Sequence, residues 1–281
     1  MKYKMEYAVY TNRINIITKT ILPIKKNSRI TRIYFGEEFC EYKFPSLEEI
    51  KEAYSLAIKN NLRFTLVTGP VTNSKIENIV SSLQYLESQK SFIEIIFNDW
   101  GVFNIIKSFS RLTPVMGRML VKINRMPRYS IHLPIPFSYL VTNENLWETQ
   151  KNVLKDTNLS VEVYRQFLKR QGIKRIECDL VPQGINLNKE WGFYFSFYTP
   201  YSYITGGRTC EIAGIYQKYK SQFVTQEKCT QPCKNFYISF ETNGYTLPLK
   251  QFGNSIFFEN KKLVPVYLKS KIFNRCVIEF F

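Results

Sequence analysis

Short apolar runs alternate with amphipathic segments between residues 29 and 122. An apolar run bounded by turn residues predicts a strand, and apolar residues at three- and four-residue steps predict a helix. The expected strands are Arg32–Gly36, Phe64–Val67, Phe92–Phe97 and Thr113–Gly117. The expected helices are 46–60, 73–88 and 98–109.

Two of these helices carry recognisable start signals. Ser46 and Glu49 form a capping-box pattern, and Asn98 with Asp99 supplies an N-cap for the third helix. The expected apolar stripe of the first helix consists of Leu47, Ile50, Tyr54 and Ile58.

The pattern weakens over residues 118–157 and then resumes with a helix over 160–171 and a strand over 173–178. The later expected strands are Trp191–Tyr198, Phe236–Phe240, Ser255–Phe258, Leu263–Leu268 and Arg275–Phe281. Alternating strands and helices with short connections imply parallel strands and right-handed crossovers. We therefore expect an α/β fold: a (β/α) barrel-like single domain over residues 1–281, incomplete or irregular in its last third. A doubly wound sheet is the alternative, although no Gly-rich dinucleotide turn follows any expected strand.

The composition is that of a folded protein, with 281 residues, 44% hydrophobic and 16% aromatic. No apolar run approaches the roughly 18 residues that span a membrane, and the N-terminus lacks the apolar core of a signal peptide. We expect a cytoplasmic protein, where structural disulfides are disfavoured. Its six cysteines therefore indicate metal binding or packing.

The charge is strongly positive, with 39 basic and 23 acidic residues giving +16. Such an excess favours an anionic partner such as RNA, anionic lipid or a negatively charged metabolite. A compositional bias toward Lys, Asn, Ile and Tyr explains it equally well. The single histidine, His132, excludes multi-histidine metal sites, and no Ser–His or Cys–His arrangement supports proteolysis.

Four cysteines follow or precede expected strands in a way that brings them to one end of a barrel. Residues just beyond the C-terminal strand ends of a parallel barrel converge at its mouth. The four are Cys40, Cys210, Cys229 and Cys233. Metal binding and simple burial both remain open for them, whereas Cys178 and Cys276 lie within strand patterns and are assigned to packing. Structural zinc sites normally use two close pairs of ligands. Two ligands here are isolated, which favours an iron–sulfur cluster over zinc.

Five polar residues lie at expected strand ends or beside a cysteine and are candidates for substrate binding. They are Glu37, Asn98, Asp99, Arg118 and Arg208. The arginines could act as forks for a carboxylate or phosphate, and the basic run over residues 111–128 could hold RNA phosphates. The alternative is that Asn98 and Asp99 only cap a helix and that the arginines make ordinary surface contacts.

Four short elements resemble a known family: IYFGEEFC, NDWG, GGRTC and the final CxxxC. The chain resembles the collagenase-like peptidase family (peptidase family U-thirty-two) and is similar in particular to its UbiV-type iron–sulfur branch. The resemblance implies that Cys40, Cys210, Cys229 and Cys233 ligate a 4Fe–4S cluster. In the family, Ser-Lys-Arg typically follows the first cysteine, where this chain has Glu41-Tyr42-Lys43, and the gap between Cys210 and Cys229 is longer here.

The resemblance also implies a function. It suggests oxygen-independent hydroxylation of an aromatic ubiquinone precursor or RNA, with a prephenate-like anion as oxygen donor and a protein partner of the same family. Because four cysteine ligands leave no iron free, two hypotheses follow. The chain is an enzyme or enzyme subunit, or it is a non-catalytic iron–sulfur module that supports a partner.

Overall fold

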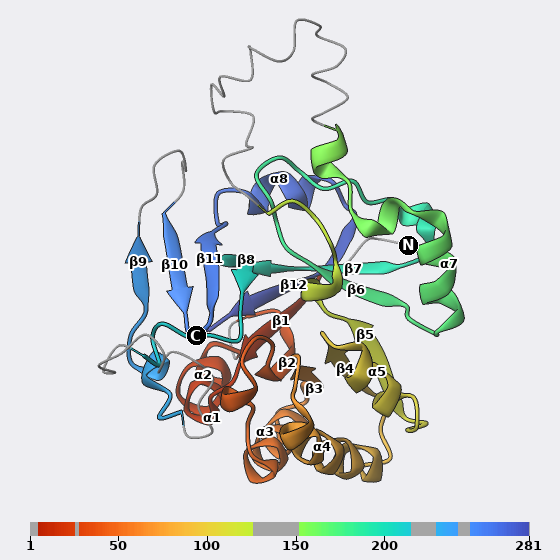
Figure 1. Ribbon diagram of the computed structural model, residues 1–281. Coiled ribbons are helices and arrows are strands. Elements are labelled where there is room, and N and C mark those ends of the chain that lie inside the picture. The colour runs from red at the N-terminus through yellow and green to blue at the C-terminus, as the bar shows by residue number, and fades with distance from the viewer. Residues whose placement is uncertain (1–4, 26–27, 126–151, 215–228, 241–247, 281) are drawn as a thin grey trace, which may run out of the picture.

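Eight parallel strands close into a barrel in the computed structural model, which describes residues 5–25, 28–125, 152–214, 229–240 and 248–280 (Figure 1). The order around the barrel is β1-β12-β7-β6-β5-β4-β3-β2. The strands are β1 (Glu6–Thr11), β2 (Ile30–Glu37), β3 (Arg63–Thr68), β4 (Ile93–Phe97), β5 (Leu112–Met116), β6 (Arg175–Cys178), β7 (Tyr194–Thr199) and β12 (Phe273–Glu279). The expected (β/α) barrel is therefore confirmed, and the doubly wound alternative is wrong.

Helices pack against the outer face of the barrel, with α3, α4 and α5 beside β2 to β5 (Figure 1). The helices are α1 (Ile14–Ile16), α2 (Leu22–Lys25), α3 (Leu47–Lys59), α4 (Ile76–Ser88), α5 (Trp100–Ile106), α7 (Glu162–Arg170) and α8 (Val264–Lys269). A π-helical turn (Ile17–Ile21) joins α1 to α2. None of the helices in the described residues is long and apolar enough to cross a membrane.

Helix α3 begins with the predicted capping box. The Ser46 hydroxyl accepts from the amide of Glu49 at 3.2 Å, and the Glu49 carboxylate accepts from the amide of Ser46 at 2.8 Å. The buried face of α3 consists of Ile50, Ala53, Tyr54 and Ala57. Ile58 is 50% exposed, so its assignment to the apolar stripe is wrong. The small alanines at 53 and 57 form the contact instead, which brings the helix close to the strands.

A second, antiparallel sheet of four strands is inserted between β7 and β12. Its order is β8-β11-β10-β9, and the strands are β8 (Tyr201–Gly206), β9 (Ile238–Phe240), β10 (Leu249–Phe252) and β11 (Ser255–Glu259). Because β8 starts directly after the C-terminal end of β7, this sheet extends from the mouth of the barrel (Figure 1). The insertion explains why the last third of the chain has few helices.

The segment expected to be a strand over Leu263–Leu268 is helix α8, so that prediction is wrong. A short apolar run cannot distinguish a strand from a buried helix. Pro265 lies in the first turn of α8, where its missing N–H costs no hydrogen bond.

The barrel interior is apolar in the middle and charged at both ends. The central layer consists of Ala8, Tyr10, Tyr34, Val67, Ile96, Val115, Tyr198 and Val277. At the N-terminal ends of the strands, Arg275 pairs with Glu94 at 2.6 Å and with Glu6 at 2.7 Å. Cys178 and Cys276 are buried in the outer apolar core, as expected.

Candidate metal centre at the mouth of the barrel

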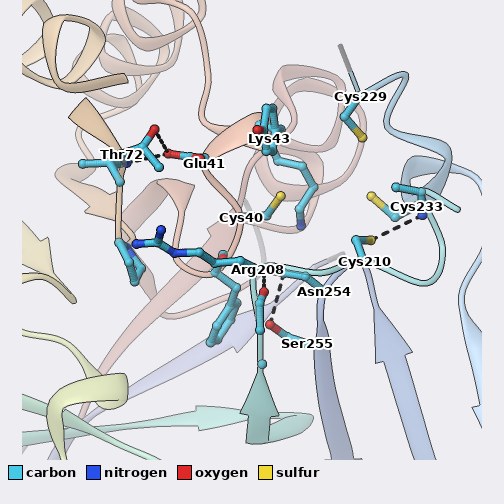
Figure 2. A pocket seen from close by; sticks show the side chains of 18 of the residues that line it. Cys40, Glu41, Lys43, Thr72, Arg208, Cys210, Cys229, Cys233, Asn254 and Ser255 are labelled. Carbon is cyan, nitrogen blue, oxygen red and sulfur yellow. Dashed lines mark hydrogen bonds between the residues drawn. The ribbon is translucent and has the colours of Figure 1, made fainter. Parts of the chain in front are cut away.

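Four free cysteines from distant parts of the chain line one cavity of about 270 Å³. Cys40 follows β2, Cys210 follows β8, and Cys229 and Cys233 precede β9. Each thiol is partly buried, and Figure 2 shows the four sulfurs around the same space. The structure therefore brings together the four cysteines that the sequence predicts to meet at the mouth.

The four cysteines do not form a site for a single metal ion as they stand. Within the described part of the chain, no three His, Cys, Asp or Glu side chains are placed so that they could hold one metal ion. Zinc bound tetrahedrally at about 2.3 Å would need sulfurs roughly 3.8 Å apart. In a cubane iron–sulfur cluster each cysteine binds a different iron, so the four sulfurs surround a larger object. Thiolates are ligands both for zinc and for iron–sulfur clusters.

The loop that carries Cys40 is held by Glu37. Oε1 of Glu37 accepts hydrogen bonds from the amides of Phe39 at 3.1 Å and Cys40 at 3.3 Å. Its Oε2 accepts from Nδ2 of Asn12 at 2.6 Å and lies 2.8 Å from Nζ of Lys43. Glu37, predicted to bind substrate, does not line the cavity; it positions the Cys40 loop.

Gly36 allows β2 to bend into this loop. Its φ of +141° is rarely adopted by other residues, and a Cβ at this position would lie 2.0 Å from the carbonyl oxygen of Val67. Only glycine fits between β2 and β3 here, so the close approach of the two strands requires a glycine at this position of the YFGEE sequence.

The CxxxC loop is fixed by contacts to two other segments. The side-chain amide of Gln231 donates to the carbonyl of Tyr42, and Nη2 of Arg13 donates to the carbonyl of Lys234 at 2.8 Å. Backbone amides also approach two sulfurs, from Gln231 to Cys229 and from Ala213 to Cys210, both at 3.4 Å. Amide donors of this kind stabilise thiolates in iron–sulfur sites.

Burial makes three of these cysteines harder to deprotonate. Burial raises the pKa of Cys40 to about 12, and the carboxylate of Glu37 contributes in the same direction. Burial also raises the pKa values of Cys210 and Cys233. A metal that binds here must displace thiol protons, so its binding becomes tighter as the pH rises.

Asn98 and Asp99, predicted to bind substrate, have structural partners. Oδ1 of Asp99 accepts from the amides of Gly101 at 2.6 Å and Val102 at 3.2 Å, which makes it the N-cap of α5. The buried amide of Asn98 donates to Oε1 of Glu38 at 3.3 Å and accepts from the backbone of Met119 at 3.0 Å. Neither residue lines the cavity, and the capping interpretation of Asp99 is confirmed.

Arg118 is fully buried and pairs with three carboxylates of the protein itself. Its nitrogens lie 2.9 Å from Glu38, 3.1 Å from Asp179 and 2.5 Å from Glu279. The ring centroid of Tyr198 lies 3.9 Å from the guanidinium carbon. The geometry gives Arg118 a structural role in place of the expected contact with a bound anion.

Arg125 joins the same network through Asp179, at 3.1 Å, and is 8% exposed. Two arginines of the expected basic loop thus point into the protein, which leaves them unavailable for RNA phosphates. His132 lies outside the described residues.

Arg208 is the one predicted substrate-binding residue that lines the cysteine cavity. It is exposed, and Figure 2 shows its side chain extending away from the four cysteines toward the side of Thr72 and Glu41. Besides the cysteines, the residues that line the cavity include Pro70, Val71, Thr72, Met119 and Arg208.

Two residues of the site, Lys43 and Gln231, were not singled out from the sequence. Both lie beside predicted ligands, Lys43 three residues after Cys40 and Gln231 between Cys229 and Cys233. Their roles depend on contacts between loops that are distant in sequence, and the residues next to them in the chain do not predict such contacts.

Comparisons with protein-family models and with curated proteins give no match. Among solved structures, the chain is similar to a glycoside hydrolase family 18 N-acetylglucosaminidase from Paenibacillus barengoltzii, with 10% identity and a TM-score of 0.32 over 99% of this chain and 95% of that chain.

Proposed function

We propose that the protein binds a 4Fe–4S cluster through Cys40, Cys210, Cys229 and Cys233. The observation that carries this proposal is that four free cysteines from three distant segments line one cavity. The other two cysteines are buried in the apolar core and are not part of it. Six free thiols suit the reducing cytoplasm, where we place the protein.

The bound cluster would supply one-electron redox chemistry at the mouth of the barrel. Around it, the residues of the chain have separate tasks. Glu37 orients the Cys40 loop, Gln231 and Arg13 hold the CxxxC loop, and backbone amides donate to two of the sulfurs. Four protein ligands leave no iron open, which favours electron transfer over direct binding of substrate to the metal.

Other residues that line the cavity are suited to a small anionic substrate. They include the apolar side chains of Val71 and Met119 and the exposed cation of Arg208. A guanidinium binds a carboxylate or phosphate in a bidentate manner, and the apolar wall suits an aromatic ring. We propose that the protein is an enzyme or enzyme subunit in oxygen-independent hydroxylation of an aromatic precursor or RNA. A prephenate-like anion and a protein partner of the same family follow from the resemblance of the sequence motifs.

The second candidate is a non-catalytic iron–sulfur module that supports a partner protein. Two features favour it. Four cysteines would complete the ligand set of a cluster, and a cluster bound by them would connect the loop after β2 to the inserted sheet. In this case the cluster stabilises the mouth and its folding is coupled to cluster binding.

The ligand proposal is tested by single alanine variants purified without oxygen. We expect Cys40→Ala, Cys210→Ala, Cys229→Ala and Cys233→Ala to lose bound iron, sulfide and visible absorption. Cys276→Ala, which alters a core cysteine, is the matched control and should retain them. Retention of the cluster in all four ligand variants would overturn the proposal.

The two functions are separated by comparing cells with and without the gene. Loss of a hydroxyl group from a quinone precursor or from an RNA nucleoside supports the enzyme. Unchanged pools of both, together with a chain that binds the cluster, support the module.

A further inference from the structure

Lys43 places a buried positive charge beside the cysteine cavity. Its side chain is 12% exposed, and it lines both the cysteine cavity and a second cavity of about 170 Å³ on the other side of Cys233. A Cβ on Gly253 would lie 3.7 Å from Sγ of Cys233 and 3.8 Å from Cε of Lys43, so these two side chains converge on the same glycine. Figure 2 shows the ammonium end of Lys43 pointing into the space between Cys40 and Cys210.

Glu37 places a negative charge next to this ammonium group. The distance from Nζ of Lys43 to Oε2 of Glu37 is 2.8 Å, and the Glu37 side chain is 2% exposed. The other carboxylate oxygen of Glu37 accepts the amide of Cys40. The ion pair between Lys43 and Glu37 therefore lies next to Cys40, a proposed cluster ligand.

We propose that Lys43 and Glu37 form a charge pair that sets the reduction potential of the cluster, with Lys43 raising it and Glu37 lowering it. This inference rests on the proposed function, since it requires the cluster at the four cysteines. Lys43 and Glu37 are positioning residues in this account, because neither contacts a substrate.

The physical reason is the charge of the reduced cluster. Reduction adds one electron to the cluster, and no bond forms or breaks; the electron comes from an external donor, which is dithionite in a titration. A nearby cation stabilises the extra negative charge, and an anion destabilises it. Both groups are shielded from water, so added salt screens their effect less than that of surface charges.

A purely structural role for the ion pair makes a different prediction. If the pair only held the Cys40 loop in place, removal of either member would disturb the same loop. The two variants would then change the potential in the same direction, or would change only the stability of the site. Opposite shifts require that the charges themselves act on the cluster.

The test is a set of anaerobic redox titrations on the full chain, monitored by visible absorption and electron paramagnetic resonance. Lys43→Met should lower the midpoint potential, Glu37→Gln should raise it, and Lys43→Arg should remain close to the unaltered protein. Lys174→Met is the matched control, because Lys174 is exposed and directly precedes β6 at the opposite end of the barrel. Its potential should not change.

The outcomes separate this inference from the proposed function. Absence of a cluster from the unaltered protein refutes both. A bound cluster whose potential does not move in Lys43→Met and Glu37→Gln, or moves in the same direction in both, overturns the charge pair alone. If Lys43→Met fails to retain the cluster, the upward shift in Glu37→Gln and the unchanged value in Lys43→Arg decide the question.

Discussion

The side-chain amide of Gln231 donates a hydrogen bond to the main-chain carbonyl of Tyr42, which joins two loops 189 positions apart in the chain. One loop carries Cys40 and the other carries Cys229 and Cys233. The bond from Arg13 to the carbonyl of Lys234 supports the second loop from another side. The two loops are therefore held together by protein contacts in addition to any metal, and this preorganisation favours binding.

Replacement of Gln231 should loosen the site without removing a ligand. We expect Gln231→Ala to lower the free energy of unfolding by about 1 kcal/mol, the usual value for one hydrogen bond, and to release iron faster to a chelator. The release is measured by the decay of visible absorption. Gln166→Ala removes an exposed hydrogen bond to Glu162 on α7 and serves as the control. Equal release rates in the two variants would contradict the role of Gln231.

Arg118 should be among the most important residues for stability. Arg118→Met leaves Glu38, Asp179 and Glu279 without their shared partner in a buried setting. The loss of one member of a buried ion network costs about 3–5 kcal/mol, which chemical denaturation can measure. Arg111→Met breaks an exposed pair with Glu87 and should cost at most about 1 kcal/mol. Comparable losses in the two variants would show that the Arg118 network is not formed.

Stability should fall in acid because of Glu94. Burial alone would raise the pKa of Glu94, but hydrogen bonds and charge from Arg275, with Arg32 and Arg175, lower it from 4.5 to about 2. A lowered pKa stabilises the folded state above pH 4.5, and this contribution, on the order of 3 kcal/mol, disappears as the pH falls from 4.5 to 2. Glu94→Gln should flatten the dependence of the melting temperature on pH in this window. An unchanged slope would exclude Glu94 as its source.

Glu279 should make the folded protein less stable as the pH rises, whereas Glu94 makes it less stable as the pH falls. Burial raises its pKa to about 8 despite the neighbouring Arg118. Burial also raises the pKa of the neighbouring Glu38, to about 7, so both carboxyl groups hold protons more tightly than free ones. The contribution of a raised carboxyl pKa is complete below pH 4.5 and is lost as the pH rises through 8.

An amide resembles the protonated acid, so Glu279→Gln should reduce the decline in melting temperature between pH 5 and 8. Thermal unfolding across this range measures the effect. A decline as steep as that of the unaltered protein would show that Glu279 does not carry the proton.

The barrel was predictable because its strands are short apolar runs separated by helices with clear start signals. Ser46 and Asp99 cap their helices as expected. β1, β8 and β10 were missed, because Glu6–Thr11, Tyr201–Gly206 and Leu249–Phe252 are short and mix apolar with polar residues. Leu263–Leu268 was misassigned because the same short apolar sequence fits a strand or a helix.

Cys40 lies beyond a parallel strand end, as predicted, whereas Cys210, Cys229 and Cys233 lie in loops of the inserted antiparallel sheet. The partners of Arg118 lie at the same mouth, because Glu38, Asp179 and Glu279 are at or just beyond the C-terminal ends of β2, β6 and β12. Topology places these carboxylates near one another, but their pairing with Arg118 depends on side-chain packing. The position of Lys43 beside Cys233 could not be inferred either. The two side chains meet at the turn around Gly253, which is distant in sequence from both Lys43 and Glu37.

The most direct test of the central claim is the metal content of the unaltered protein purified without oxygen, measured by elemental analysis together with acid-labile sulfide. We expect iron and sulfide in equal amounts, with a broad visible absorption that fades when oxygen degrades the cluster. Zinc without sulfide, or neither iron nor sulfide after reconstitution with both, would contradict it.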